Sequence, residues 1–590
     1  MNELKQTLSF LLLQILQKDY SNEIKHVDLQ PTRKEFEGDL TYTVFPLIKI
    51  TRKAPELLGQ EIGEKLLATA PDLVEKFNVI KGFLNISIRK GYFLSKLIER
   101  YKSGHWVSKT AEPQHIMVEY SSPNTNKPLH LGHIRNCLLG WSVSRLYEAI
   151  GHTVYRVQII NDRGIHICKS MVAWQKFANG ATPASTGIKG DHFVGDYYVL
   201  FEKEYKRQVS ELVQQGLPEE IAKEQAPIMR EAREMLLRWE QNDPTTLELW
   251  NKMNSWVYEG FDRTYARLGV NFHKNYYESQ TFLLGRDIVQ KGLEKGIFYK
   301  KDDGSVWIDL TADGLDHKLL LRRDGTSVYI TQDIGTAVAR FEEFPIKKLI
   351  YTVANEQDYH FKVLFLILKK LGYSWADHLY HLSYGMVELP HGRMKSREGT
   401  VVDADDLLDE MEKTSAELTA QFGKAEGLPE EEKRHLYTAI GHGALKYFIL
   451  KVDPRKKMIF NPEESIDFNG HTGPFIQYTH ARISSLLHRA ESVSIPNVSI
   501  VLNEEEFNLL KSLMLFSDTV HKAADEYNPS ELANYLYEVA RLYNSMYQKH
   551  SILTAESGEK RQLRVFLSDC TRIILSQGLD LLGIKAPERM

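Results

Sequence analysis

The spacing of apolar residues changes along the chain and divides it into regions with different expected structures. Between 113 and about 385, short apolar runs rich in β-branched residues alternate with segments of helical spacing. That alternation predicts an α/β region in which helices cover a parallel sheet. From about 430 onward the helical spacing continues alone, through 433–451, 472–492, 503–527, 529–550 and 559–583. We therefore expect the last region to be an all-α bundle, with no strands beyond about 430.

Within the α/β region, the first strands are expected at 116–120 and 153–160. Between about 180 and 285, long helical patterns replace the strands, which indicates a helical insertion between two halves of the fold. The second half is expected to begin with a strand at 305–310, and a later strand at 349–353 precedes a helix at 361–371.

Two further segments complete the expected elements. An Asp-Gly turn at 324–325 is expected to lead into another strand. Residues 1 to about 108 combine an opening helix, alternation at 40–45, a helix at about 54–68 and a strand at 83–88, which predicts a small α+β module.

Composition limits the class of protein. At 590 residues the chain is too long for a single core, so we expect three or four domains. A hydrophobic content of 43% is typical of globular proteins, and no apolar run reaches the roughly eighteen residues that a membrane span needs. The scattered cysteines Cys137, Cys168 and Cys570 form no disulfide framework and indicate a reducing, cytosolic compartment. A net charge of −4 leaves any contact with nucleic acid to local basic patches.

The stretch 123–133 carries the clearest chemistry, because it joins a buried strand to a helix. The free N–H groups at such a helix start form a site for phosphate, and Gly132 leaves room where a bulky side chain would block a ligand. His130 and His133 lie three residues apart, on one face of the first turn. Two surface histidines at a helix start remain the alternative. A zinc pair would need further ligands, and no Cys pair or nearby Glu supplies them.

A second polar stretch, 392–399, is a glycine-bracketed loop that carries Arg393, Lys395 and Arg397. By itself a basic loop is usually a solvated surface turn. Here it follows a phosphate-binding helix start within the same α/β sequence, which makes it a candidate clamp for phosphate.

Both stretches resemble the signatures of class I aminoacyl-tRNA synthetases. The Ser-Pro-Asn-x-x-Lys-Pro-x-His-x-Gly-His of 122–133 resembles the arginyl form of the first signature, and 392–399 resembles the second, Lys-Met-Ser-Lys-Ser. Ser396 stands where the second signature has its last lysine, and in arginyl enzymes a lysine before the histidine motif compensates; Lys127 holds that position. Segments 36–40, 467–478 and 581–590 also resemble arginyl-tRNA synthetases, so the chain is identified as a member of that family, of a bacterial kind.

The resemblance implies a multidomain α/β architecture. Its parts are an α+β N-terminal domain at 1–108, a Rossmann-like parallel-sheet catalytic domain at 109–430 with the helical insertion, and an all-α anticodon-binding bundle at 431–590. The implied reaction is ATP-dependent ligation of L-arginine to tRNA(Arg) through an arginyl-adenylate. ATP and Mg²⁺ are the implied cofactors, with Mg²⁺ bound to ATP and no dedicated metal site in the protein. A cytoplasmic monomer is expected, with neither DNA nor membrane as a partner.

The resemblance also implies roles for particular residues. The residues expected to stabilise phosphate charge during catalysis are His130, His133, Lys127, Lys395 and Arg397. The expected ATP-binding residues are Gly132, His130, His133, Gly385, Met386 and Met394. The residues expected to hold the arginine substrate are Glu119, Asn124, His130, Tyr329, Asp333 and Gln357. The residues expected to contact tRNA are Phe475, Tyr478 and Met590.

A planar guanidinium favours carboxylate partners, and Tyr329 and Asp333 share one face if a helix begins there. Asp333 as a plain helix-start acid is the alternative. Three other functions stay open at this point: another class I synthetase, a non-catalytic tRNA-binding paralogue and a general nucleotidyltransferase. The arginyl-like ending disfavours the first, the presence of both signatures the second, and the helical bundle the third.

Overall fold

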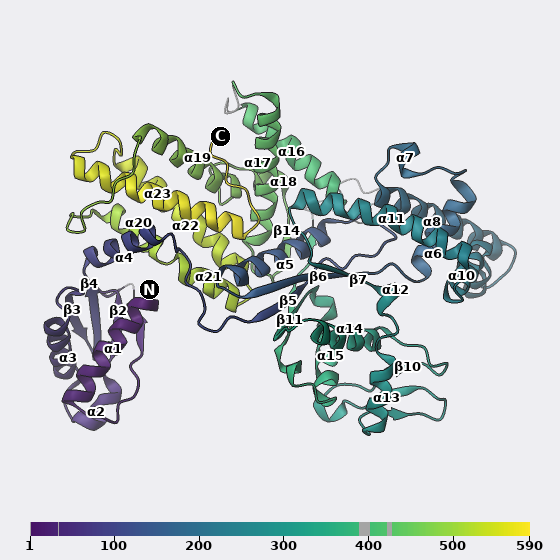
Figure 1. Ribbon diagram of the computed structural model, residues 1–590, viewed down its shortest axis with the longest axis horizontal. Helices are drawn as coiled ribbons and strands as arrows, with labels where there is room; N and C mark the ends of the chain where they lie inside the picture. Colours follow the sequence, from purple (N-terminus) through teal and green to yellow (C-terminus); the bar gives the residue numbers. More distant parts are fainter. Residues whose placement is uncertain (1, 34, 389–401, 422–426) are drawn as a thin grey trace.

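The computed structural model describes residues 2–33, 35–388, 402–421 and 427–590, and Figure 1 shows their arrangement. A parallel sheet lies near the centre, a small N-terminal unit and the C-terminal helices lie toward one end, and a group of helices lies toward the other. No helix in the described ranges is long and apolar enough to span a membrane.

The N-terminal unit is an antiparallel sheet covered by helices. The sheet has the order β1-β2-β4-β3. Its strands are β1 (Leu29–Pro31), β2 (Leu40–Thr43), β3 (Val74–Ile80) and β4 (Phe83–Ile88). Its helices are α1 (Asn2–Asp19), α2 (Phe45–Thr51), α3 (Pro55–Thr69) and α4 (Lys90–Ser103). The predicted alternation, helix and closing strand are confirmed as β2, α3 and β4.

The central sheet is parallel throughout and has the order β12-β11-β5-β6-β7. Its strands are β5 (His115–Glu119), β6 (Thr153–Ile160), β7 (Lys274–Tyr277), β11 (Lys348–Ala354) and β12 (Leu379–Tyr384). Side chains alternate between the faces of a strand, so Ile116 and Val118 pack in the core on one face and Met117 in the core on the other. Both faces are therefore buried, as expected for a parallel sheet.

Helices before β7 include the predicted insertion. They are α5 (Leu131–Ala149), α6 (Ile165–Phe177), α7 (Pro183–Thr186), α8 (Gly190–Gln214), α9 (Glu219–Gln225), α10 (Pro227–Glu240) and α11 (Pro244–Leu268). The later elements of this half are α12 (Glu278–Thr281), α13 (Arg286–Glu294), α14 (Tyr329–Glu343), α15 (Asp358–Lys370) and the 3-10 turns η1 (Thr311–Asp313), η2 (Asn355–Gln357) and η3 (Ser374–His378). The helix predicted at 361–371 is α15.

The strand predicted at 305–310 is confirmed as β9 (Val306–Ile308), which lies in a separate antiparallel sheet with β8 (Tyr299–Lys300) and β10 (Lys318–Leu321). One prediction for this half is wrong. The residues after the Asp-Gly turn form helix α14 and not a strand. The turn instead follows β10, and apolar side chains such as Ile330, Ile334 and Ala337 recur at helical spacing and are buried.

The C-terminal part is a helical bundle. Its helices are α16 (Ala404–Gln421), α17 (Glu430–Leu450), α18 (Pro462–Ser465), α19 (Gly473–Ala490), α20 (Glu504–Met514), α21 (Phe516–Asp525), α22 (Pro529–Lys549) and α23 (Gly558–Leu581). Polar N-caps start several of them, among them Thr472, Asn503 and Ser557, whose side chains accept backbone N–H groups. The prediction of no strand beyond 430 is wrong, because β14 (Met458–Ile459) pairs in parallel with β13 (Val387–Glu388).

Candidate active site

The start of α5 is organised by its two histidines. His130 is the N-cap residue, and its Nδ1 accepts the N–H of Gly132 at 3.1 Å. The Nδ1 of His133 accepts the N–H of His130 at 3.2 Å, and the two ring centroids lie 3.9 Å apart. Because each Nδ1 is an acceptor, the ring hydrogen of each neutral imidazole is on Nε2, which is left to donate to a ligand.

Burial keeps both rings neutral at pH 7. Burial, reinforced by the nearby Lys127 ammonium, lowers the pKa of His130 to about 4. The pKa of His133 is lowered well below its usual value by the same burial and by its two neighbours. Burial also lowers the pKa of Lys127. The helix start thus offers neutral N–H donors, backbone N–H groups and one lysine, a set that suits phosphate oxygens better than a metal cation.

Two residues that follow the histidines on α5 bind backbone carbonyls of distant segments, and the sequence interpretation missed both. Arg135 is fully buried and donates to the carbonyls of Pro454, Lys456 and Met386, at 3.0, 2.8 and 3.3 Å. Asn136 donates to the carbonyl of Thr352 in β11 at 2.7 Å. The signal was present in the sequence, since a charged residue and an amide lie among apolar positions of one helix.

Asn136 also stabilises a strained turn after β5. Ser121 and Ser122 both have positive φ, 70° and 51°, which is uncommon for residues other than glycine. The Ser121 N–H donates to Asn136 Oδ1 at 2.5 Å, and the Ser121 and Tyr265 hydroxyls are 2.7 Å apart. Such a conformation costs roughly 1–3 kcal/mol per residue and persists where surrounding contacts enforce it, as at ligand sites. It directs the chain from Glu119 into the histidine stretch.

The predicted ATP residues Gly385 and Met386 lie beside the carbonyls that Arg135 binds. The Gly385 N–H donates to the Pro454 carbonyl at 2.9 Å, and a Cβ at Gly385 would lie 2.6 Å from the Lys456 backbone. Only glycine allows that approach. The other predicted phosphate contacts, Met394, Lys395 and Arg397, lie outside the described residues.

A buried carboxylate lies where β5 ends. Glu119 is the last residue of β5, is buried, and forms an ion pair with Arg340 of α14. Arg340 is 1% exposed and lies under the rings of Tyr276 and Tyr351, 4.8 and 5.9 Å from their centroids. A predicted partner of the arginine substrate therefore already holds a guanidinium from its own chain.

Asp333 lies one turn into α14, on the same face as Tyr329. Its Oδ2 is 2.6 Å from His360 Nε2, and its side chain is 37% exposed. Tyr329, the first residue of α14, is 78% exposed, and Gln357 ends the η2 turn that leads into α15. The predicted helix start and shared face are thus present, with Asp333 open to solvent on one side.

Asn124, also predicted to contact arginine, forms a parallel bridge with Asn161 at the ends of β5 and β6. The predicted arginine residues therefore come from the carboxyl edge of the sheet and from α14, the edge at which open α/β sheets bind ligands.

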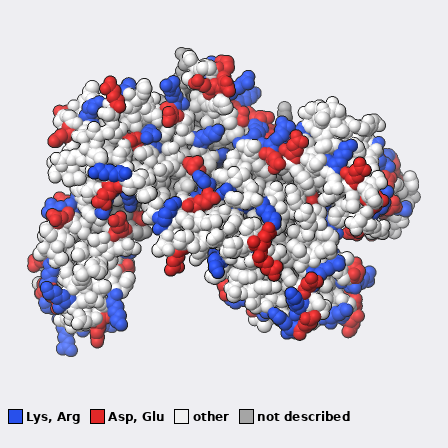
Figure 2. Space-filling view, in the orientation of Figure 1, with Lys and Arg blue, Asp and Glu red and all other residues white. Residues whose placement is uncertain are grey.

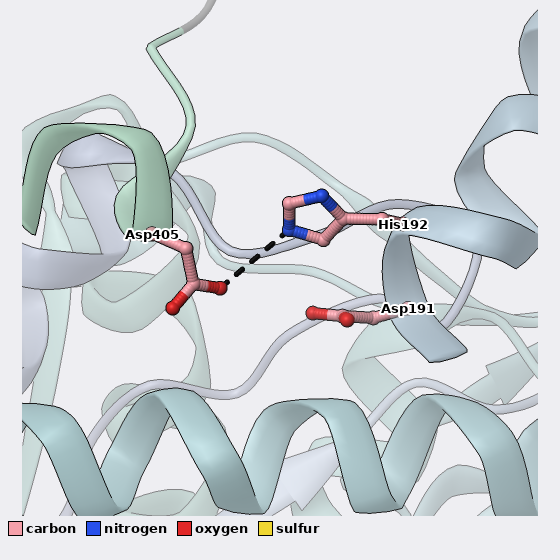
Figure 3. A group of neighbouring side chains, drawn as sticks. All are labelled: Asp191, His192 and Asp405. Atoms are coloured by element: carbon pink, nitrogen blue, oxygen red, sulfur yellow. Dashed lines mark ion pairs between the residues drawn. The ribbon is translucent and has the colours of Figure 1, made fainter. Parts of the chain in front are cut away.

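One group in the described ranges has metal-ligand character. The carboxylates of Asp191 and Asp405 and the ring of His192 place ligand atoms within 4.8 Å of one another (Figure 3). Lys189 Nζ lies 2.8 Å from an oxygen of each aspartate. A divalent cation would have to displace that ammonium, so the group is better described as an ion-pair cluster.

The predicted tRNA residues lie at the C-terminal bundle. Phe475 and Tyr478 are on α19; Phe475 packs against Tyr537 at 5.3 Å, and the guanidinium of Arg482 lies 4.7 Å from the Tyr478 ring centre. The C-terminal tail, which ends at Met590, crosses this helix, because Gln477 donates to the Lys585 carbonyl at 2.8 Å.

A cavity of about 950 Å³ lies beside the tail, bounded by α5, α11, α17 and residues 583–589. Lys446 in its wall is buried, its Nζ donates to the Gly583 carbonyl at 2.6 Å, and burial lowers its pKa to about 8. Lys585 and Arg589 also line the cavity. On the face shown in Figure 2, basic and acidic side chains are interspersed, so attraction of a polyanion depends on local groups of this kind.

Three family models together match nearly the whole chain. Residues 96–461 match the model of the class I (R) tRNA synthetase catalytic domain, and 2–88 match the arginyl tRNA synthetase N-terminal domain. Residues 476–590 match the DALR anticodon binding domain. The first match alone covers more than half of the chain.

Curated relatives and solved structures agree with these models. The arginine–tRNA ligase of Bacteroides thetaiotaomicron is 54% identical, with 97% of each chain covered, and that of Phocaeicola vulgatus is 52% identical, with 100% of each covered. The Thermus thermophilus arginyl-tRNA synthetase has the same fold, with a TM-score of 0.79, 24% identity and coverage of 99% of this chain and all of the other. The chain therefore belongs to the arginyl-tRNA synthetase family within the class I aminoacyl-tRNA synthetases.

Proposed function

We propose that this chain ligates L-arginine to tRNA(Arg) at the expense of ATP, through an enzyme-bound arginyl-adenylate. The observation that carries the proposal is the carboxyl edge of the parallel sheet, where β5 ends at the carboxylate of Glu119 and the chain continues to the neutral imidazole donors at the start of α5, with the carboxylate of Asp333 on α14. Donors suit the phosphates of ATP, and carboxylates suit a guanidinium. The division into units at 1–108, 109–430 and 431–590 is part of the proposal.

In the first step, a carboxylate oxygen of arginine attacks the α-phosphorus of ATP, and the bond from that phosphorus to the bridging oxygen breaks to release pyrophosphate. The carboxylate is already ionised at pH 7, so no general base is needed. The Nε2–H groups of His130 and His133, with Lys127 and the α5 backbone, would stabilise the charge that develops on phosphate oxygens. Mg²⁺, when bound with ATP, would neutralise part of the same phosphate charge. Lys395 and Arg397 are proposed to act on it from the opposite side.

In the second step, a hydroxyl of the terminal adenosine of tRNA attacks the arginyl carbonyl, and AMP leaves with the electrons of the acyl–phosphate bond. The groups that held the phosphates in the first step would hold AMP as it leaves. Gly132, Gly385, Met386 and Met394 are proposed to line the nucleotide site.

Arginine recognition is proposed to depend on Asp333 more than on Glu119. Asp333 is partly open and its partner is a histidine, whereas Glu119 is buried against Arg340. Tyr329 would pack on the guanidinium plane, and Asn124, Gln357 and His130 would contact the rest of the amino acid. A pocket built for charge and hydrogen bonds rejects analogues that lack the guanidinium by roughly 10⁴ or more.

Recognition of tRNA is proposed to involve Phe475, Tyr478 and Met590, and the cavity beside the tail gives room for an unstacked nucleotide. Its buried Lys446 and its neighbours Lys585 and Arg589 would face phosphate or base acceptors. We further propose that the chain functions as a monomer in the cytoplasm.

The test is aminoacylation of total tRNA with each of the twenty amino acids in turn, with ATP and Mg²⁺ present. We expect arginine alone to be esterified, with AMP and pyrophosphate formed. Charging with another amino acid would assign a different specificity, and tRNA binding without any charging would make the chain a non-catalytic paralogue. Omitting ATP is the control, and it should abolish the product.

A further inference from the structure

The backbone around His130 is held by a segment far away in the sequence. The Leu131 N–H donates to the Val402 carbonyl at 2.8 Å, and the Ala404 N–H donates to the Leu129 carbonyl at 2.9 Å. His130 itself forms an antiparallel bridge with Asp403. The residues on both sides of His130 are therefore paired with the segment that begins α16, and any shift of that segment moves the imidazole.

That segment is fixed in turn by charged groups. Asp403 Oδ1 accepts the N–H groups of Asp405 and Asp406, at 2.8 and 3.1 Å, which caps the start of α16. Asp405 Oδ2 lies 2.8 Å from Lys189 Nζ, and its Oδ1 accepts from Arg267 at 3.1 Å. The segment beside His130 is thus tied to the helical insertion, which supplies both cations.

Lys189 has all three of its donors used. Besides Asp405, its Nζ lies 2.8 Å from Asp191 Oδ2 and 2.6 Å from the Thr264 hydroxyl. His192 Nε2 lies 3.5 Å from Asp405 Oδ2, as the dashed line in Figure 3 marks. We call Lys189, Asp191, His192, Thr264 and Asp405 the Lys189 cluster. It joins α8, α11 and α16, and Asp191 within it has no exposed surface.

Close backbone packing supports the cluster. A Cβ at Gly260 would lie 2.3 Å from Asp191 Oδ1, so glycine in α11 makes room for that carboxylate. Four residues farther along α8, a Cβ at Gly195 would lie 2.9 Å from Pro128 Cδ. Helix α8 thus reaches the histidine stretch twice, directly at Pro128 and through Asp405 at His130.

We propose that Lys189 is a positioning residue for His130 and that the start of α8 serves as a fixed support for the phosphate-binding end of the active site. Lys189 would act through Asp405 and the Val402–Leu131 pairing, without touching a substrate. The inference rests on the proposed function, since its consequence is measured on the chemical step. It gives the insertion a role in catalysis that no signature motif supplies.

The test compares Lys189→Met with Lys189→Arg, which keeps a cation able to reach both carboxylates. Charging is measured with saturating ATP and tRNA at varied arginine, at a temperature where circular dichroism shows each variant folded. A misplacement of about 1 Å can cost ~10²-fold in rate, so we expect kcat of Lys189→Met to fall by roughly 10–10²-fold. The KM for arginine should stay unchanged, and Lys189→Arg should recover most of the rate.

Two controls separate positioning from stability. Lys176→Met removes a lysine of α6, just before the insertion, whose partner Glu231 on α10 is on the surface, and it should leave kcat unchanged. Gly195→Ala presses on Pro128 without changing any charge and should lower kcat, whereas Gly558→Ala, where a Cβ meets no atom within 4 Å, should not. If Lys189→Met fails to fold, the comparison of Gly195→Ala with Gly558→Ala still tests the proposal.

A folded Lys189→Met with wild-type kcat, or one whose defect is a raised KM for arginine, would overturn the proposal. Equal kcat values for Gly195→Ala and Gly558→Ala would overturn it as well. Failure of the proposed function looks different, because then the unsubstituted chain itself would charge no arginine.

Discussion

The two ends of the proposed active site differ in their electrostatics. At the start of α5, His130 and His133 are neutral, each Nδ1 accepts a backbone N–H group, and no carboxylate in the described ranges forms an ion pair with Lys127. At the other end, Glu119, the last residue of β5, and Asp333 on α14 each already have a partner in the chain, Arg340 and His360.

We explain this difference by the time at which each end meets charge on the substrate. Phosphate charge moves during the reaction, so donors for it must be in place and free of competing acids. The guanidinium of arginine is charged at all times, and the carboxylates proposed to bind it must also be accommodated when no substrate is bound. Two unpaired carboxylates near one another in a desolvated pocket would repel and take up protons, and an internal cation offsets that cost.

The largest effect is expected from breaking the buried pair. Glu119→Gln leaves the Arg340 guanidinium buried without its counter-charge, and the loss of one partner of such a pair costs about 3–5 kcal/mol. We expect a matching fall in the free energy of unfolding by urea. Glu343→Gln, on the same helix as Arg340, is the control. The ion pair that Glu343 forms with Lys274 is over a third exposed and is worth about 0–1 kcal/mol.

The double variant Glu119→Gln with Arg340→Met should recover stability, because no uncompensated charge remains. If Glu119→Gln instead keeps wild-type stability and raises the KM for arginine, Glu119 belongs to the substrate and the comparison of the two ends fails.

The next largest effect is expected on kcat, when a histidine at the start of α5 is replaced. His133→Ala or His130→Ala removes one preorganised donor, which typically costs about 10²–10³ in kcat. The measurement is single-turnover charging with saturating ATP, and His378→Ala, at the exposed end of η3, serves as the control. Unchanged turnover in either variant would leave that imidazole as a helix cap only.

Asp333→Asn should act on arginine and not on ATP. A hydrogen bond to a charged group is worth about 1.5–3 kcal/mol, so we expect the KM for arginine to rise by roughly 10–10²-fold. We choose this range over that of a buried ion pair because the Asp333 side chain is 37% exposed. The arginine dependence of charging measures it, and a wild-type dependence would reduce Asp333 to a helix-start acid.

The smallest effect concerns pH: we expect the His130 ring not to titrate near neutral pH. The pKa of His130 is lowered to about 4, so its ring should stay neutral from pH 8 down to about pH 5. Histidine NMR of labelled protein should show its resonance constant over that range, whereas an unperturbed imidazole would titrate near 6.5. Because the unfolded chain binds more protons between pH 6.5 and about 4, stability should fall as pH falls through that window. Titration of His130 near 6.5 would refute the neutral-donor description.

Local signals in the sequence were sufficient for much of the fold. The strands at 116–120, 153–160 and 349–353 and most C-terminal helices follow from periodicity, because the spacing of apolar residues records which face each element buries. The single helix expected at 503–527 is two helices, α20 and α21. The same reasoning failed after the Asp-Gly turn, where the turn chemistry favoured a hairpin but the apolar side chains from Ile330 onward recur at helical spacing and pack as α14.

For the site, the sequence by itself determined which residues stand at a phosphate-binding helix start, since 123–133 is one continuous segment whose turn, glycine and histidine spacing are local properties. Only the tertiary structure decided which charged side chains form ion pairs with one another. Arg340 on Glu119, His360 on Asp333 and Lys189 on Asp405 join residues from 27 to 221 positions apart. Ion pairs and desolvation depend on distance in space and on burial, and neither is recorded in the spacing of residues along a chain.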